Sequence, residues 1–274
     1  MVDVACNPRV LVLTPEVTYL PDRMGGLASF FTAKAGGLAD VSAALVTALF
    51  EQGADVHVAI PDYRSIFSDG LAPVLRKEFR TIRRKMPDDR IHLAEDRAFY
   101  YINRVYSAYG EENIKMALAF QREVINNIVP RVQPDLIHCN DWMTGLIPAM
   151  ARQMGIPCLF TIHNVHTVKT TLAYIEDRGI DAAYFWQNLY FEHMANHYEE
   201  AREIDSRTRD KILGRRTDLC DQEACGARAI NGLMCSTAAR SLTIEAVDLR
   251  NSGDTAGHRQ RVRHRVAQVQ APDR

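Results

Sequence analysis

The sequence predicts an α/β fold with a doubly wound, Rossmann-like parallel sheet, and three observations support this prediction. Short apolar segments rich in β-branched residues recur along the first 204 residues, as is typical of strands buried on both faces. Segments with apolar residues at helical spacing lie between them. Glycine and proline mark the short connections, so strands and helices alternate in the order that forms parallel βαβ units.

The first βαβ unit lies near the start of the chain. Residues 9–14, RVLVLT, form the first expected strand. A glycine-rich loop follows, and apolar residues then recur at helical spacing over 38–49, up to Gly53. Residues 55–60, DVHVAI, alternate into a second strand and complete the unit.

The second βαβ unit follows a less regular middle region. In that region a basic stretch at 76–85 precedes an expected strand at 98–105 and an expected helix at 113–128. The second unit consists of a strand, a helix and another strand, with glycine and proline in the turn before the last one. Its segments are 135–139, 142–154 and 158–163. Because such sheets bind ligands beyond the carboxyl ends of their strands, we expect the functional residues there.

The end of the chain differs from the rest in composition. All 22 Phe, Trp and Tyr lie at or before Tyr198, and the aromatic-rich stretch 183–198 predicts a helix that packs on the sheet or on a second domain. Residues 205–274 contain 12 Arg, one Lys and no sustained periodicity, so we do not expect them to fold by themselves. The sequence therefore predicts a folded domain at 1–204 and a disordered tail at 205–274.

Charge and composition restrict the possible partners. The chain has 33 Lys and Arg against 34 Asp and Glu, so no overall basic field favours nucleic acid or an anionic membrane. The first 204 residues are nevertheless acidic, with 20 basic and 25 acidic side chains. No secretory signal pattern and no apolar run of about 18 residues occur, so a cytoplasmic location without membrane contact is expected. The six cysteines lack paired close spacing, which suits that compartment.

The loop before the first helix contains the first candidate site. Lys34, Gly36, Gly37 and Asp40 lie in the segment KAGGLADV. Two glycines let backbone N–H groups approach an anion, the helix N-terminus adds positive potential, and the lysine adds a full charge. These residues predict a phosphate site. The alternative is a plain turn with a solvated lysine, because neither known phosphate-loop pattern is present.

Two further candidates follow the strands of the second unit. Asp141 lies between a strand and the next helix, where its carboxylate can accept hydrogen bonds from sugar hydroxyls or, alternatively, merely cap the helix. His163, followed by Asn164, ends the next strand and can donate to a hydroxyl or a developing oxyanion, unless its role is structural. With His138 and His166 these side chains are of metal-ligand type, but no metal-binding spacing supports a metal site.

The order of these motifs carries a resemblance to a known family. The segments KAGGLADV, HCNDWMTGLIPA and TIHN, within residues 9–203, are similar to the N-terminal catalytic domain of bacterial glycogen and plant starch synthases. The resemblance implies the N-terminal half of a GT-B fold, which has two facing Rossmann-like domains. It also implies transfer of glucose from ADP-glucose or UDP-glucose to the non-reducing end of an α-1,4-glucan, with retention and without a metal or other cofactor.

The resemblance further implies a role for each matched residue. Asp141 and His163 would contact the transferred glucose as the catalytic pair, and no residue would act as a covalent nucleophile. Lys34 and the neighbouring backbone would face the donor diphosphate. The substrate-binding residues implied in this way are Lys34, Gly36, Gly37, Asp40, Tyr106 and Asn164.

Some positions depart from the family pattern. This sequence has Ala35 where the family's common K-T-G-G motif has threonine. It has Asn140 and Met143 where the common H-D-W-H motif has its two histidines. These changes spare the lysine, the glycines, the aspartate and the later histidine. They bear on acceptor preference and donor nucleotide more than on the class of reaction.

No segment after residue 204 resembles the family's second domain. An aromatic-free, arginine-rich tail is what a shifted reading frame of GC-rich DNA would encode, and a genuine disordered tail is the alternative. The sequence thus predicts a glucosyltransferase domain that is incomplete for efficient transfer. A non-catalytic module that binds glucan or another partner on the same half-fold is the alternative function.

Overall fold

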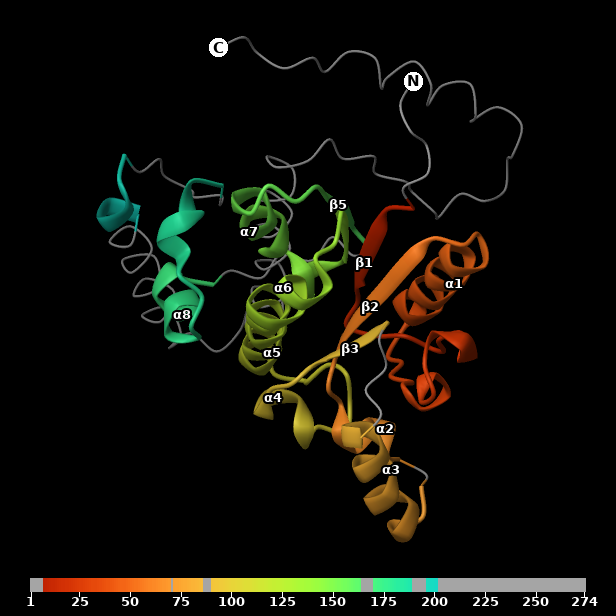
Figure 1. Cartoon of the computed structure of the whole chain (residues 1–274). Helices are drawn as coiled ribbons and strands as arrows, with labels where there is room; N and C mark the ends of the chain where they lie inside the picture. The colour runs from red at the N-terminus through yellow and green to blue at the C-terminus, as the bar shows by residue number, and fades with distance from the viewer. Residues whose placement is uncertain (1–6, 70, 86–89, 164–169, 189–195, 202–274) are drawn as a thin grey trace, which may run out of the picture. The chain divides into compact units, whose positions relative to one another are not determined.

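The computed structural model describes residues 7–69, 71–85, 90–163, 170–188 and 196–201 (Figure 1). Asn164 and the tail predicted at 205–274 lie outside these residues. In the described part of the chain, no helix combines the length and apolar character needed to cross a membrane.

A five-stranded sheet with every neighbouring pair parallel forms the centre of the fold. The strands are β1 Arg9–Leu13, β2 Asp55–Pro61, β3 Ile91–Ala94, β4 Leu136–Asn140 and β5 Cys158–Thr161. Their order is β3-β2-β1-β4-β5, so the chain reverses its direction of winding between β1 and β4. This order is Rossmann-like and confirms the predicted fold class.

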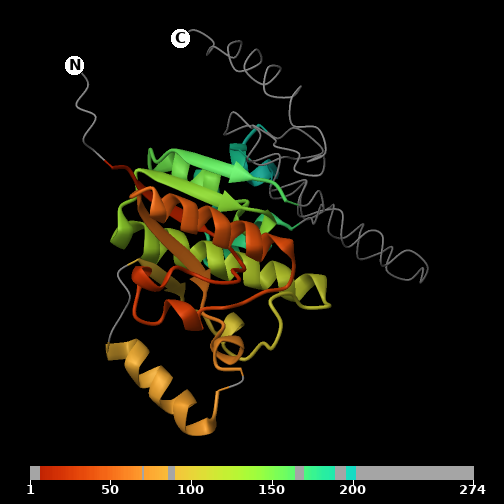
Figure 2. The ribbon, with the colours of Figure 1, turned by 90° about the vertical axis from the view of Figure 1, so that its right-hand side faces the viewer.

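Helices cover both faces of the sheet (Figures 1 and 2). One face carries α1 Gly37–Glu51, whose buried side includes the small residues Ala39 and Ala43. The other face carries the long connection from β3 to β4 and the helix that joins β4 to β5. These elements are α5 Gly110–Glu123, the π-helical turn η3 Val124–Ile128, α6 Val129–Val132 and α7 Ile147–Gln153.

The remaining elements are short, apart from α3, which extends away from the sheet (Figures 1 and 2). The α-helices are α2 Arg64–Phe67, α3 Pro73–Lys85, α4 Arg97–Tyr100 and α8 Leu172–Asp177. The 3-10 helices are η1 Asp22–Met24, η2 Ala28–Phe30, η4 Trp142–Thr144, η5 Ala182–Tyr184 and η6 Trp186–Asn188.

The strand predicted at 98–105 is wrong, because the third strand is β3, at Ile91–Ala94. Asp96 explains the difference. Its carboxylate accepts a hydrogen bond from the Ala98 backbone N–H at 2.7 Å and starts the helix α4. It also accepts a bond from Arg122 of α5 at 2.5 Å. The aromatic residues of this stretch favour a strand, but the helix cap at Asp96, held by Arg122, starts a helix there instead.

Two predicted helices are interrupted. The helix predicted at 142–154 divides into η4 and α7. The aromatic stretch predicted as a helix at 183–198 forms the short turns η5 and η6 where it is described, and residues 189–195 lie outside the description.

Candidate functional site

The candidate site lies at the carboxyl ends of β1, β4 and β5. Neighbouring strands that leave in opposite directions along the sheet open a crevice at their carboxyl ends, and β1 and β4 are such a pair. The chain passes from β1 to Glu16, from β4 to Asp141 and from β5 to His163. The fold therefore brings three sequence-distant polar residues to one edge of the sheet.

Glu16 connects the elements of this edge. The side chain is buried, with 2% exposure, and its Oε2 accepts bonds from the backbone N–H groups of Ala35 and Gly36 at 2.6 and 2.8 Å. Its Oε1 accepts a bond from the Tyr106 hydroxyl at 3.0 Å. One carboxylate thus fixes the glycine loop and the tyrosine relative to β1.

Further contacts hold both ends of the loop between β1 and α1. Val17 and Ala33 form an antiparallel bridge with backbone bonds of 2.8 and 2.9 Å. The Thr14 hydroxyl donates to the Glu16 carbonyl at 2.7 Å and lies 2.8 Å from the Ser42 hydroxyl of α1. The start of α1 is therefore tied to the end of β1, and the loop that precedes it has a defined position.

Lys34 and Asp40 form an ion pair at the mouth of this loop. The Lys34 Nζ lies 2.9 and 2.8 Å from the two carboxylate oxygens of Asp40, and the Thr18 hydroxyl donates to the same carboxylate at 2.6 Å. The hydrogen bond from Lys34 lowers the pKa of Asp40. Because both side chains are about half exposed, at 48% and 54%, an incoming anion can compete with Asp40 for Lys34.

Gly36 and Gly37 leave open space before the first turn of α1. Neither has a left-handed backbone, and a Cβ atom added to either would meet no other atom within 4 Å. Gly36 is the N-cap of α1 and provides no side-chain cap. Its own N–H is bound to Glu16, so any anion would use the helix amides after Gly36.

Asp141 has a strained backbone. Its φ of 62° and ψ of −174° lie in a backbone region that is nearly exclusive to glycine. A residue with a side chain in this region costs about 1–3 kcal/mol of stability. The residue is 1% exposed, and its N–H donates to the Thr161 carbonyl at 2.9 Å. The side chain does not cap η4, so the helix-cap interpretation of Asp141 is wrong. Strain at a buried carboxylate of this kind is typical of functional sites.

His163 lies in the electric field of two carboxylates. Burial lowers the pKa of His163, while the charges of Asp141 and Glu16 raise it in part. The balance favours the neutral imidazole. The His163 Nε2 lies 3.2 Å from the Asn140 Oδ1.

Tyr106 belongs to the same cluster. Its ring packs on Trp142 with 5.9 Å between the centroids, and its hydroxyl is bound to Glu16. Burial, followed by the charge of Glu16 and to a smaller extent that of Asp141, raises the pKa of Tyr106, which keeps the phenol neutral.

The structure brings together most of the predicted residues. Tyr106, Asp141 and His163 surround Glu16, which links them to the loop of Lys34, Gly36, Gly37 and Asp40. Asn164 lies outside the described residues. Sequence reasoning missed Glu16 as a site residue and gave no role to Asn140 beside Asp141. An acidic residue at the carboxyl end of a buried strand is the signal that could have found Glu16. Across the described ranges, no group of three His, Cys, Asp or Glu side chains is arranged to hold a metal ion.

These features define a Rossmann-like α/β protein with an exposed lysine–aspartate pair and a buried polar cluster at the switch point of its sheet. The family described as starch synthase catalytic domain matches residues 9–204, and the chain belongs to this family.

Individual curated relatives are glycogen synthases. A glycogen synthase of Exiguobacterium sibiricum is 34% identical over 155 residues, covering 48% of this chain and 32% of the relative. A glycogen synthase of Moorella thermoacetica is 30% identical over 177 residues, covering 57% and 33%. The chain therefore spans about a third of the length of these curated relatives. A solved structure, the catalytic domain of starch synthase IV from Arabidopsis thaliana bound to ADP and acarbose, aligns with a TM-score of 0.40 and 19% identity over 58% of this chain and 34% of that one.

Proposed function

We propose that residues 9–204 form the N-terminal catalytic half of a GT-B glucosyltransferase. It would transfer glucose from ADP-glucose or UDP-glucose to the non-reducing end of an α-1,4-glucan, with retention. Membership of the starch synthase family supports the glucosyltransferase activity. The observation that carries the proposal is the strained, buried Asp141 beside His163, linked through Glu16 to the Lys34 loop. The chain spans about a third of the length of its relatives. In the proposal, efficient transfer therefore requires a second domain that faces this one.

The Lys34 loop suits the diphosphate of the donor. In the proposal Lys34 exchanges Asp40 for a phosphate oxygen, and the first turn of α1 provides further N–H donors. The lysine charge then offsets the negative charge that builds on the departing nucleotide. The open space at Gly36 and Gly37 allows the phosphates to approach the backbone.

The Asp141 and His163 side chains suit the transferred glucose. The Asp141 carboxylate would accept hydrogen bonds from sugar hydroxyls. Its negative charge would stabilise the positive charge of an oxocarbenium-like transition state. Glu16 adds a second negative charge to the same region. The proposal includes no covalent nucleophile, no metal and no cofactor.

Donor binding to the full 274-residue chain tests the proposal. Isothermal titration calorimetry would compare ADP-glucose with UDP-glucose on the natural chain, Lys34→Ala, and the control Lys77→Ala on the exposed surface of α3. We expect binding to weaken about tenfold or more in Lys34→Ala, which corresponds to about 1.4 kcal/mol, and to stay unchanged in Lys77→Ala. An absence of binding to either donor, or equal binding by Lys34→Ala, would contradict the proposal.

A transfer assay addresses the catalytic pair. Incorporation of radiolabelled glucose into glycogen would be measured for the same chain with Asp141→Asn and His163→Ala. Transfer that survives both changes would remove these residues from the mechanism. Binding of maltoheptaose without any binding of donor would favour the alternative, a non-catalytic glucan-binding module.

A further inference from the structure

We propose that Asn140 holds His163 in the tautomer with its proton on Nε2, so that Nδ1 faces the substrate as a hydrogen-bond acceptor. Asn140 would be a positioning residue, because it acts on the substrate through His163. The part that concerns the substrate rests on the proposed function. The tautomer itself follows from the contacts of Asn140 alone.

The first step is the orientation of the Asn140 amide. Asn140 ends β4 and is 1% exposed, and one amide atom lies 3.0 Å from the backbone carbonyl oxygen of Leu13 in β1. A carbonyl oxygen can only accept, so the amide atom in contact with it must be the NH₂ group. The other atom of the amide is then the oxygen Oδ1, and its position is fixed by the neighbouring strand.

The second step is the proton on His163. The Asn140 Oδ1 lies 3.2 Å from the His163 Nε2. Since this oxygen can only accept, Nε2 must carry the hydrogen. A neutral imidazole has one N–H, so Nδ1 keeps its lone pair. The Leu13 carbonyl on β1 therefore fixes the orientation of the Asn140 amide, and this amide determines which nitrogen of His163 carries the proton.

The third step is the chemical consequence. Within the described residues, the charges of Asp141 and Glu16 act on His163, and His163 in turn acts on His138. The two carboxylates favour an added proton on Nδ1, whereas burial disfavours it. In the neutral state Nδ1 receives a hydrogen bond from a hydroxyl of the glucose unit. His163 therefore selects a sugar O–H group, rather than donating to a developing oxyanion as the sequence alone allowed.

Nuclear magnetic resonance of the full chain tests this inference. A two-bond ¹H–¹⁵N correlation spectrum of the imidazole rings distinguishes the two neutral tautomers, and loss of signals in His163→Gln assigns the ring. At pH 7.5 and without ligand we expect the Nε2–H pattern for His163. An Nδ1–H pattern would overturn the inference, and this measurement needs no variant of Asn140.

Three variants sharpen the test. Asn140→Ala should give a mixture of tautomers, and Asn140→Asp, of similar shape, should raise the titration midpoint of His163 by about one pH unit or more, because a carboxylate then faces Nε2–H. The control Asn127→Ala, at an exposed asparagine of η3, should leave both unchanged. An unchanged His163 signature in both Asn140 variants would contradict the inference.

The outcome can be separated from that of the proposed function. An Nδ1–H pattern together with normal calorimetric binding of ADP-glucose would overturn the role of Asn140 alone. An Nε2–H pattern without any donor binding would confirm the tautomer and overturn the proposed substrate. If both hold, adding ADP-glucose should shift the Nδ1 resonance of His163, and no shift would contradict the acceptor role.

Discussion

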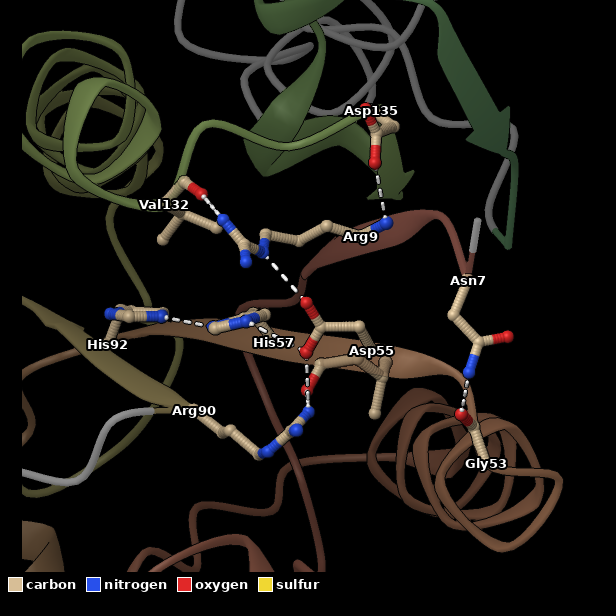
Figure 3. A network of polar contacts seen from close by, with 10 residues as sticks. Asn7, Arg9, Gly53, Asp55, His57, Arg90, His92, Val132 and Asp135 are labelled. Carbon is tan, nitrogen blue, oxygen red and sulfur yellow. Dashed lines mark hydrogen bonds and ion pairs between the residues drawn. The ribbon is translucent and has the colours of Figure 1, made fainter. Parts of the chain in front are cut away.

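The two edges of the central sheet use polar side chains in opposite ways. At the amino ends of the strands, charged groups are paired with one another (Figure 3). The Asp55 carboxylate accepts bonds from Arg9 and from Arg90, each at 2.8 Å. Arg9 also donates to the Val132 carbonyl at 2.9 Å. This edge connects β1, β2 and the segment before β4, and its contacts serve the fold.

A pair of histidines continues this network. The Arg131 guanidinium lies 3.3 Å from the His92 Nδ1 and can only donate, so His92 carries its proton on Nε2. This N–H donates to the His57 Nδ1 at 3.0 Å. The His57 Nε2 then faces Asp55 at 3.4 Å. Every nitrogen in this row has a partner while both rings are neutral.

The carboxyl edge contains features that do not serve stability. Asp141 has a strained backbone, the Lys34–Asp40 pair is half exposed, and Gly36 and Gly37 face open space. Glu16 and Asn140, in contrast, each make several hydrogen bonds, as the residues of the opposite edge do. The difference indicates that the carboxyl edge is built for a ligand on a rigid support, and four predictions test it, in order of expected effect.

Glu16→Ala should have the largest effect, because it removes that support. Three hydrogen bonds to a buried carboxylate are lost, and the N–H groups of Ala35 and Gly36 lose their acceptor. We expect a loss of about 3–5 kcal/mol in the free energy of unfolding, measured in urea. Glu51→Ala, at an exposed position of α1, serves as the control. A loss as small as that of the control would show that the loop needs no anchor.

Acidification should destabilise the chain through its buried histidines. Burial lowers the pKa of His92 to about 3, against 6.5 in the unfolded chain. Between these values the unfolded state binds more protons, so stability falls as pH decreases, by up to about 1.4 kcal/mol per pH unit for His92. The effect fades as the pH rises through 6.5, because the unfolded chain then also leaves His92 neutral.

Urea unfolding between pH 7 and pH 4 measures this slope. His92→Gln should reduce the slope, whereas the exposed His197→Gln should not. His138, at the carboxyl edge, has a pKa lowered to about 4 by burial and contributes in the same window. An equal slope in His92→Gln and the natural chain would contradict a neutral, buried histidine row.

Much of the fold was predictable because its signals are local. β1, α1, β2, β4 and β5 follow apolar patterns within a few residues of the predicted bounds. The position of the third strand was not predictable, because the helix cap at Asp96 depends on Arg122, which lies 26 positions away. The candidate residues at strand ends were predicted from position, but Glu16 was missed because its partners lie 19, 20 and 90 positions away. Side-chain pairing over such distances has no periodicity in the sequence.

Asp141→Gly should be more stable than Asp141→Ala, and both should lose the glucose contact. Glycine adopts the backbone angles of Asp141 without strain, although it also gains freedom in the unfolded chain. Both variants lose the carboxylate and its contacts, so the difference between them reports the backbone strain. We expect the free energy of unfolding of Asp141→Gly to exceed that of Asp141→Ala by about 1 kcal/mol. Equal stability of the two variants would contradict a strained backbone at Asp141 and would remove this contrast with the amino edge.

Lys34→Ala and Asp40→Asn should have the smallest effect on stability. Their ion pair is exposed to water, and pairs of this kind contribute little to folding. We expect urea midpoints within error of the natural chain for both variants. Donor binding should nevertheless separate them, because Lys34→Ala removes the charge that the diphosphate needs. Asp40→Asn, in contrast, frees that charge from its competitor and should tighten binding at low salt. Weaker binding by Asp40→Asn would contradict this competition and would make Asp40 a contact of the donor. A large loss of stability in either variant would place this pair with the structural network of the amino edge and would remove the main contrast between the two edges.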